Sequence, residues 1–555
     1  MRIIKNSTKS VRIVALAAAL VLFVCSACTA QEGDAAQTAS PKPTVVKEQL
    51  EEEYNAKPGG DMAISIPASV ASWDPVLAED EEVINMLSLI YETPLELSNN
   101  GIFSPGLIES WTVDDSKTVF TFKVRQGVTF HSGKTMTADD VLYTINKILA
   151  LDAAQPVQEE STAEEQTQTQ AADTQANRYA QYNDEIVSVD KTDDYTIVLT
   201  MNTPGRDALY FMTFPVLCSE TDAATSLNGT GVYCVQERRE DGSILLAANT
   251  NWWKVAPYIQ TITAVPNASA AQKASNYDAG VLSLYTTKSI AASKQKTAGV
   301  TQVVDYMTNY YDCIIPNLFK ESLKEAAVRK ALSYAIDRRE IVSSVLLNHA
   351  VAAEIPISPD FFAYDVKYKL YEHDVMAAKE LLQSVGYTTE EEGGNPLTLT
   401  MIVPSEIGYE YRLEVARLIA NQLSEIGVVC NVQELSVTDY TTALNNGSFD
   451  LAYCSYYMDQ NPDVSFMLRT GEPLNYGMVA SSDLDAILDR CNAALSESEV
   501  KEAYGELQQY FIDKVPQIGL FYRMHSVIVS EEIKGIENLK ENNIFKDVES
   551  WSIAQ

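Results

Sequence analysis

Residues 105–141 read PGLIESWTVDDSKTVFTFKVRQGVTFHSGKTMTADDV and contain the clearest structural pattern in the chain. Residues 118–125 alternate apolar and polar side chains, as a strand with one buried face does. Turn-forming residues, 114–116 and Gly127, bracket that strand. Residues 137–140 (TADD) then look like a helix N-cap followed three positions later by an acidic residue. The stretch predicts a β-meander that leads into a helix.

Residues 397–457 alternate strand and helix patterns. Strands are predicted over 397–403, 428–432 and 451–456, and helices over 411–426 and 438–444. A βαβαβ run favours a parallel sheet with right-handed crossovers. Ligands bind beyond the carboxyl ends of such strands. The side chains at the end of the last strand, Tyr456, Tyr457, Met458 and Asp459, are therefore candidates for a binding site.

Two helices are predicted from one-sided apolar patterns. In the segment 327–338, Val328, Ala331, Leu332, Ala335 and Ile336 share one face, which predicts a face packed on a core. A second helix is expected between Asp374 as its cap and Gly386 as its stop.

The segment 228–233 contains Gly229 and Gly231. We expect these glycines to permit a turn that needs a positive φ. A G-x-G pattern without a third glycine and a strand-to-helix setting is weak evidence for nucleotide binding.

Composition limits the possible functions. The chain has 41 basic and 76 acidic residues and a net charge of −35, which argues against nucleic acid as a partner and against a basic membrane-binding face. The four histidines form no HExxH pair, and no G-x-S-x-G or Walker motif is present. We expect no enzymatic activity, no cofactor and no metal site. Acidic pairs are too frequent for counting alone to exclude a glycosidase.

The N-terminal residues have the pattern of a signal peptide. Four basic residues precede the uncharged stretch 13–24, which is short for a membrane span. Small residues directly before Cys28 resemble a bacterial lipobox, so residues 1–27 are predicted to be a lipoprotein signal peptide and Cys28 the lipidated residue. Cleavage by ordinary signal peptidase, with Cys28 as a bystander, is the alternative. Residues 28–57 lack an apolar pattern and are predicted to form a disordered tether.

Two further features concern the folded part. Residues 153–177 are dominated by Gln, Glu, Thr and Ala, which predicts a disordered insertion. Beyond Cys28 there remain six cysteines, which permit 15 pairings. We expect free, mostly buried thiols with at most a single bridge.

Several motifs together resemble the family 5 extracellular solute-binding proteins, the receptors of peptide, nickel and oligosaccharide ABC importers. They are Trp73-Asp74-Pro75, Tyr91-Glu92-Thr93-Pro94-Leu95, the stretch 105–141, and segments 228–233, 327–338 and 503–522. The resemblance implies a two-lobed, clamshell α/β fold of the periplasmic-binding-protein type, with an extra β-rich subdomain in the first lobe. Lobe I would span 58–310, with the subdomain at about 90–195, and lobe II 311–515. Residues 516–555 would return to lobe I.

The resemblance also implies a function without chemistry: a lipid-anchored, monomeric receptor on the outer face of the bacterial cytoplasmic membrane, or in the periplasm, that passes a short peptide to ABC permease subunits. Residues 456–463 resemble the family segment whose aspartate pairs with the peptide ammonium, and that aspartate is Asp459 here. A turn cap before Pro462 is the alternative role for Asp459. Trp73 is either a stacking wall of the cleft or a lid on the core.

Other functions remain open from the sequence. Within the same receptor class, the ligand is alternatively an oligosaccharide or a nickel complex. In a different class, the chain is a surface adhesin or a peptide-signal receptor that has lost transport.

Overall fold

The computed structural model describes residues 57–152, 179–296, 299–368, 371–388, 394–406 and 408–554. All of them belong to one compact unit, Pro43–Gln555. The predicted signal peptide, Cys28, residues 28–56 of the predicted tether and the predicted insertion 153–177 lie outside the described residues. None of the helices described combines the length and the apolar character that crossing a bilayer requires.

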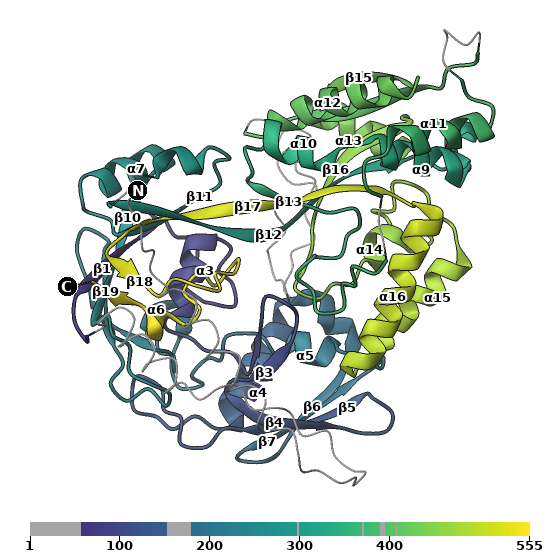
Figure 1. The fold of residues 1–555 in the computed structure, drawn as a ribbon. Helices are drawn as coiled ribbons and strands as arrows, with labels where there is room; N and C mark the ends of the chain where they lie inside the picture. Colours follow the sequence, from purple (N-terminus) through teal and green to yellow (C-terminus); the bar gives the residue numbers. More distant parts are fainter. Residues whose placement is uncertain are drawn as a thin grey trace, which may run out of the picture. The chain divides into compact units, whose positions relative to one another are not determined.

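The largest element is a sheet of 11 strands (Figure 1). Its strands follow in the order β15 (Val429–Ser436), β14 (Thr398–Ser405), β16 (Leu451–Tyr457), β12 (Thr301–Pro316), β17 (Ile518–Ser530), β11 (Leu284–Thr287), β1 (Asp61–Pro67), β10 (Thr261–Asn267), β9 (Ile244–Ala248) and β8 (Tyr233–Arg238), with β13 (Ala350–Ala352) beside β17. The long strands β12 and β17 pair antiparallel and run from one half of the sheet into the other. These two strands therefore connect the halves.

The predicted βαβαβ run is confirmed. Strand β14 pairs in parallel with β15 on one side and with β16 on the other. The intervening helices are α12 (Tyr411–Glu425) and α13 (Val437–Asn446), and α13 ends at Gly447 with a φ of 64°. A glycine accepts this left-handed conformation without a Cβ clash, so the chain turns there into β16.

The predicted β-meander is also confirmed. Strands β4 (Ile108–Val113) and β5 (Val119–Val124) form a hairpin, and β7 (Thr196–Met201) and β6 (Ile186–Asp193) extend it to a four-stranded antiparallel sheet. Helix α4 (Ala138–Asp152) follows the predicted cap, where Thr137 Oγ1 accepts from the backbone N–H of Asp139 at 3.3 Å. Two small sheets pair β2 (Leu95–Leu97) with β3 (Phe103–Pro105) and β18 (Ile533–Lys534) with β19 (Ser552–Ile553).

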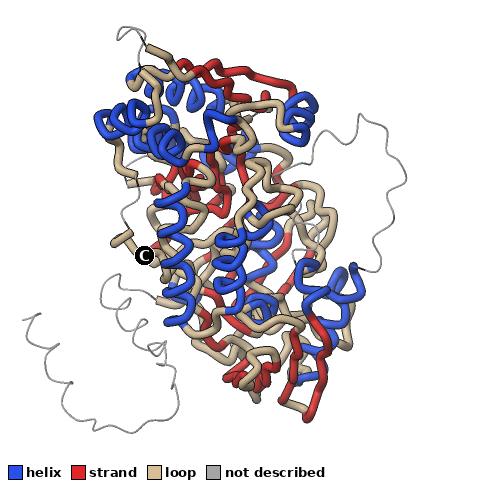
Figure 2. The backbone as a smooth tube through the Cα atoms, turned by 90° about the vertical axis from the view of Figure 1, so that its right-hand side faces the viewer, coloured by secondary structure: helices blue, strands red, loops and turns tan. Residues whose placement is uncertain are grey.

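Helices and strands are interleaved through the described chain, which gives a mixed α/β architecture (Figure 2). The remaining α-helices are α3 (Glu81–Ser88), α5 (Asp207–Phe211), α6 (Ala223–Ser226), α7 (Ala270–Asp278), α8 (Glu321–Lys324), α9 (Ala326–Ala335), α10 (Arg338–Glu340), α11 (Val375–Ser384), α14 (Ser465–Leu468), α15 (Ser482–Ala493) and α16 (Glu497–Lys514). Short 3₁₀ turns are η2 (Ala180–Glu185), η3 (Ala292–Gln295) and η6 (Val548–Ser550), and η4 (Ile341–Val345) is a π-helical turn.

The half of the sheet around β16 is buried on both faces. In β16, Cys454 and Tyr456 pack into one hydrophobic cluster with α15 and α16, whereas Leu451 and Tyr453 pack into another with α9 and α12. Successive strand residues point to opposite faces, so a strand covered on both sides reads as a continuous apolar run. The predicted apolar face of α9 lies in the second cluster, as expected. A separate, larger cluster joins β1, β10, α3 and the four-stranded sheet.

The six cysteines of the described chain are free thiols, and four of them are buried. Burial raises the pKa of Cys454 to about 12. The prediction of free, mostly buried thiols is confirmed.

The predicted reason for Gly229 and Gly231, a turn that needs a positive φ, is wrong. Neither Gly229 nor Gly231 has a positive φ. A Cβ on Gly231 would lie 2.6 Å from the carbonyl oxygen of Leu89, and one on Gly229 would lie closer still to that of Ile90. The backbone N–H of Gly231 donates to the Ile90 oxygen at 2.8 Å. The segment needs glycine because two backbones meet, not because the chain turns left-handed.

Candidate ligand-binding site

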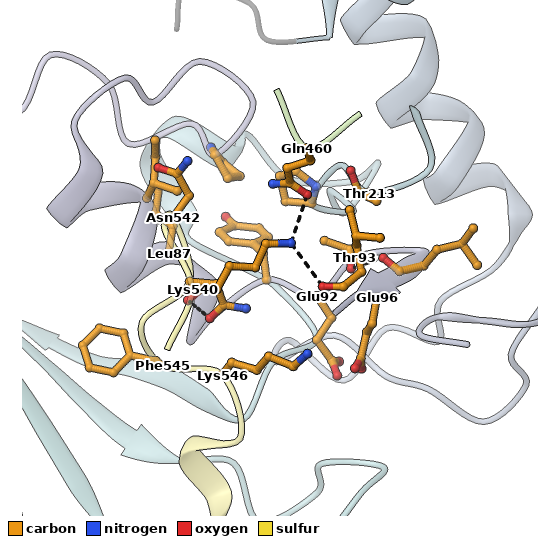
Figure 3. A pocket seen from close by; sticks show the side chains of 18 of the residues that line it. Leu87, Glu92, Thr93, Glu96, Thr213, Gln460, Lys540, Asn542, Phe545 and Lys546 are labelled. Carbon is orange, nitrogen blue, oxygen red and sulfur yellow. Dashed lines mark hydrogen bonds between the residues drawn. The ribbon is translucent and has the colours of Figure 1, made fainter. Parts of the chain in front are cut away.

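A pocket of about 220 Å³ lies among segments that are far apart in sequence (Figure 3). Its walls come from the carboxyl end of α3, residues 91–97, Tyr182 of η2 with Tyr210 of α5, residues 459–460 after β16, and residues 540–549. That volume accommodates roughly 15–20 water-sized spheres, which is the scale of a small solute. Aromatic rings and charged groups share the lining.

Asp459 lies where the sequence predicted it, at the carboxyl end of a parallel-sheet strand, and it lines the pocket. Its Oδ1 accepts from the backbone N–H of Gln460 at 2.6 Å. Gln181 donates from Nε2 to Oδ2 of the same carboxylate. Both oxygens of the carboxylate thus accept hydrogen bonds at the pocket wall.

Tyr457 lies behind the pocket wall. Its hydroxyl accepts from Nδ2 of Asn542 at 3.3 Å, and Asn542 lines the pocket. The Tyr457 ring packs edge-on against Tyr310, with 5.1 Å between ring centroids. Tyr457 therefore supports a lining residue.

Tyr456 and Met458 do not line the pocket. Both are 4% exposed and lie in the hydrophobic cluster beneath α15 and α16. The Tyr456 hydroxyl donates to the carbonyl oxygen of Leu474 at 3.1 Å. Because side chains alternate along an extended chain, these two residues face the core whereas Tyr457 and Asp459 face the opposite way.

Trp73 also lies away from the pocket. It is half-buried and packs against the cluster that contains β1, with the Arg238 guanidinium 5.7 Å from its ring centroid. Of the two roles expected from the sequence, this position fits the lid on the core. The neighbouring Pro75 does line the pocket.

The sequence reasoning missed most of the charged groups in the pocket. Carboxylates outnumber ammonium groups in the lining: Glu92, Glu96, Asp459, Glu541, Asp547 and Glu549 against Lys254, Lys540 and Lys546. The only signal was Glu92, which lies inside a motif quoted for the family. Lys540, Glu541, Lys546, Asp547 and Glu549 come from a segment for which no strand or helix pattern was recognised, so no local pattern pointed to them.

One group of these charges forms an ion network. Lys254 Nζ lies 2.6 Å from Oε1 of Glu96 and 3.8 Å from Oε1 of Glu92. Trp253 donates from Nε1 to both Glu92 oxygens, at 3.0 and 3.1 Å. Burial raises the pKa of Glu92, and Lys254 acts in the opposite direction. The network fixes these side chains at one end of the pocket.

A second group lies near the long strands β12 and β17. Glu541 is 5% exposed, and burial together with the nearby Glu81 carboxylate raises its pKa to about 8. Its Oε2 accepts from the backbone N–H of Asn309 at 2.7 Å. Burial also acts on Glu81, but the nearby imidazole of His525, whose Nδ1 lies 3.8 Å from Oε1, and the charge of Lys288 outweigh it and lower the pKa of Glu81 to about 2. At neutral pH one carboxyl of the pair is thus protonated and the other ionised.

A group of three or more His, Cys, Asp or Glu side chains suited to a metal ion is absent from the part of the chain that the structure describes.

The family model described as bacterial extracellular solute-binding proteins, family 5 (middle), matches residues 103–477. The chain therefore belongs to this family, whose members are non-enzymatic substrate-binding proteins of ABC transporters. It is an extracytoplasmic binding protein for a small solute.

Individual relatives are distant. Oligopeptide-binding protein AppA of Bacillus subtilis is 22% identical over 569 residues, which cover 97% of each chain. Heme-binding protein A of Haemophilus influenzae is 25% identical over 461 residues, covering 78% of this chain and 81% of its own. The solved structure of HbpA2 from Haemophilus parasuis matches with a TM-score of 0.75 at 20% identity, over 89% of this chain and 100% of that one. The predicted family and α/β fold class are confirmed.

Proposed function

We propose that this protein captures short peptides outside the cytoplasmic membrane and delivers them to an ABC permease. The observation that carries the proposal is the position of Asp459, a carboxylate at the end of β16 that lines the pocket. A peptide ammonium bound there forms a charge-assisted hydrogen bond, which contributes roughly 1.5–3 kcal/mol. The name of the Bacillus subtilis relative is consistent with a peptide ligand.

The proposal includes two lobes that close over the peptide. Residues 58–310 with 516–555 would form lobe I, which includes the β-rich subdomain at about 90–195, and residues 311–515 would form lobe II. The hydrophobic clusters support this division, since one cluster draws mainly on residues 62–306 and 527–551 and two others on residues 311–522. Strands β12 and β17 join the lobes and would bend on closure.

Contacts at the end of β16 support such a closure. Asn461 donates from Nδ2 to Oδ1 of Asp207 at 2.8 Å. Together with the contacts of Asp459 to Gln181 and of Tyr457 to Asn542, it ties proposed lobe II to three segments of proposed lobe I. A ligand that adds contacts to both sides would favour this arrangement.

We also propose that the protein is anchored to the membrane through a lipid. Cys28 would be lipidated, residues 28–57 would tether the receptor, and the receptor would act as a monomer. Replacing Cys28 by Ser should release the protein from the membrane fraction. Retention of the variant in that fraction would exclude the lipid anchor at this residue.

Thermal unfolding tests the ligand class. A ligand that binds only the folded state stabilises it by about 2.7 kcal/mol at 100 times its Kd. Peptides with a free amino terminus should raise the melting temperature, whereas the same peptides acetylated there should not. Oligosaccharides, nickel chelates and heme complete the panel, and a response to one of these alone would exclude the peptide function.

A matched pair of variants tests the role of Asp459 in ligand binding. Asp459→Asn should weaken binding of free peptides about 10- to 100-fold, because the ammonium loses its charged partner. Asp463→Asn is the control, since Asp463 is outside the lining and accepts from the backbone N–H of Ser465 at 2.9 Å. Equal affinity of the two variants would remove Asp459 from the site.

A further inference from the structure

His349 is a buried histidine beside the two strands that connect the halves of the main sheet. It directly precedes β13, which pairs with β17 (Figure 1). The residue is 4% exposed, and its carbonyl oxygen accepts from the backbone N–H of Met524 at 3.1 Å. His349 belongs to proposed lobe II, whereas β17 belongs to proposed lobe I. The imidazole therefore lies at the proposed hinge.

The pairing of β12 with β17 is interrupted next to this histidine. The two strands pair in regular order from Thr301 to Met307 of β12, and a register shift follows between Met307 and Tyr311. Within the shifted stretch, the backbone N–H of Asn309 donates to Oε2 of Glu541 at 2.7 Å. An irregularity of this kind bends and twists a strand pair, so the strands would bend here on closure.

The chain reaches His349 through a strained segment. The π-helical turn η4 comes first, and π-helical turns are rare and frequent at functional sites. Leu347 and Asn348 then have φ values of 51° and 68°. The left-handed conformation costs free energy for residues other than glycine and persists where the surrounding structure enforces it. The fold thus holds His349 in place against a backbone cost.

The imidazole faces a carboxylate without a hydrogen bond to it. Its Nδ1 lies 3.3 Å from the carbonyl oxygen of Leu347, which can only accept, so Nδ1 carries a proton. In the neutral ring Nε2 is then an acceptor. This Nε2 is buried, lies 3.5 Å from Oδ1 of Asp305, and has no hydrogen-bond partner within the described ranges. A proton on Nε2 would turn it into a donor and complete a charge-assisted bond to Asp305.

The surroundings single out Asp305 as the partner. It belongs to β12, and Ser526 of β17 donates from Oγ to its Oδ1 at 2.6 Å, which holds the carboxylate in place. Exposed charges on the neighbouring elements are Arg339, Glu340 and Lys294. The other charged side chains there have partners of their own: Arg523 with Asp312, His525 and Lys288 with Glu81, and Arg338 with the carbonyl oxygen of Gly519 and the charge of Glu354.

We propose that His349 and Asp305 form a proton-controlled lock on the hinge. The charged imidazole pairs with Asp305 and holds proposed lobe II against β12 and β17 in the arrangement of the structure. An opened arrangement that separates the two groups loses this attraction, so loss of the proton favours opening. An imidazole ordinarily changes its charge between pH 5 and 8. The inference rests on the proposed lobes and their closure but on no particular ligand.

The test measures the distance between the lobes by single-molecule fluorescence energy transfer. Dyes are attached to the full-length protein through non-natural amino acids at Val187 of β6 and Met376 of α11, which are 58% and 66% exposed. Without ligand, the ratio of compact to open molecules should fall about 10-fold between pH 5.5 and 8, because a charge-assisted hydrogen bond is lost. His349→Gln and Asp305→Asn should each remove most of this pH dependence.

His373→Gln is the matched control. It breaks a pair of the same type, in which Nδ1 lies 3.7 Å from Oδ2 of Asp337, but the two side chains are 35% and 31% exposed and lie outside the strands of the hinge. Its response to pH should equal that of the unaltered protein.

The outcomes separate this proposal from the peptide function. A distance distribution of the unaltered protein that is the same at both pH values would refute the lock and leave the peptide function standing, because peptide binding is measured by the melting temperature. A pH response that persists in His349→Gln would also refute it, and its loss in His525→Gln would assign the response to the pair with Glu81. The measurement on the unaltered hinge needs no substitution there, so poor folding of a variant does not block the test.

Discussion

Asp312 and Arg523 form a buried ion pair whose removal should destabilise the fold. Arg523 donates from Nε to Oδ2 of Asp312 at 2.6 Å and from Nη2 to Oδ1 at 2.9 Å. Nη2 also donates to Oγ of Ser455 at 2.6 Å. The three residues belong to β12, β17 and β16, so one cluster of polar side chains joins three adjacent strands.

The size of the expected destabilisation follows from how deeply the two side chains are buried. Asp312 is 0% exposed and Arg523 9%. In Asp312→Asn the guanidinium would keep Ser455 and the nearby rings of Tyr310 and Tyr409, with centroids 5.0 and 5.1 Å away, but no anion of the pair. Breaking a buried pair by removing one partner costs roughly 3–5 kcal/mol. Arg523→Met should cost a similar amount.

Urea unfolding, followed by tryptophan fluorescence and by far-ultraviolet circular dichroism, measures these changes. The double variant should be less destabilised than the sum of the single variants, by about 2 kcal/mol, because it leaves no unpaired charge. Glu506→Gln is the control. It breaks the exposed pair with Arg490, whose side chains are 52% and 43% exposed, and should cost less than about 1 kcal/mol. An additive double variant, or a cost of Asp312→Asn no larger than the control, would refute the reasoning.

Two further changes should alter the stability of the fold. Gly231→Ala should lower the melting temperature strongly, because the new Cβ would meet the carbonyl oxygen of Leu89. Gly133→Ala is the control: φ is +86° there and no atom lies within 4 Å of the new Cβ, so only a left-handed backbone cost of roughly 1–2 kcal/mol is expected. Equal shifts in melting temperature for the two variants would contradict this. In the folded protein the pKa of Glu541 is raised from 4.5 to about 8, so between these pH values the folded state keeps a proton that the unfolded state releases, and the free energy of unfolding should fall by roughly 3–5 kcal/mol as the pH rises. Glu541→Gln should flatten this fall. An unchanged pH profile of unfolding in the variant would contradict the prediction.

Local patterns were sufficient for the elements around β16. Strands β14, β15 and β16 and helices α12 and α13 could be predicted because alternation, helical periodicity and glycine stops all act within about 15 residues of sequence. The same patterns placed Asp459 at a strand end. They did not separate it from Tyr456 and Met458, since a strand covered on both faces reads as uniformly apolar and hides which face carries the site.

The sequence by itself determined the family, the α/β class, the parallel run from β14 to β16 and the position of Asp459, because each depends on short-range patterns or on motifs read along the chain. Tertiary structure alone decided which side chains share the pocket. Lys540 lies 80 residues from Gln460 and 443 from Leu97, yet its ammonium bonds to both. Gly229 and Gly231 were visible as glycines, but the reason for them, a second backbone at Leu89 and Ile90, appears only once the chain is folded. Contacts between distant segments leave no periodic pattern in the sequence, because the free energy that selects them comes from burial and charge pairing in three dimensions.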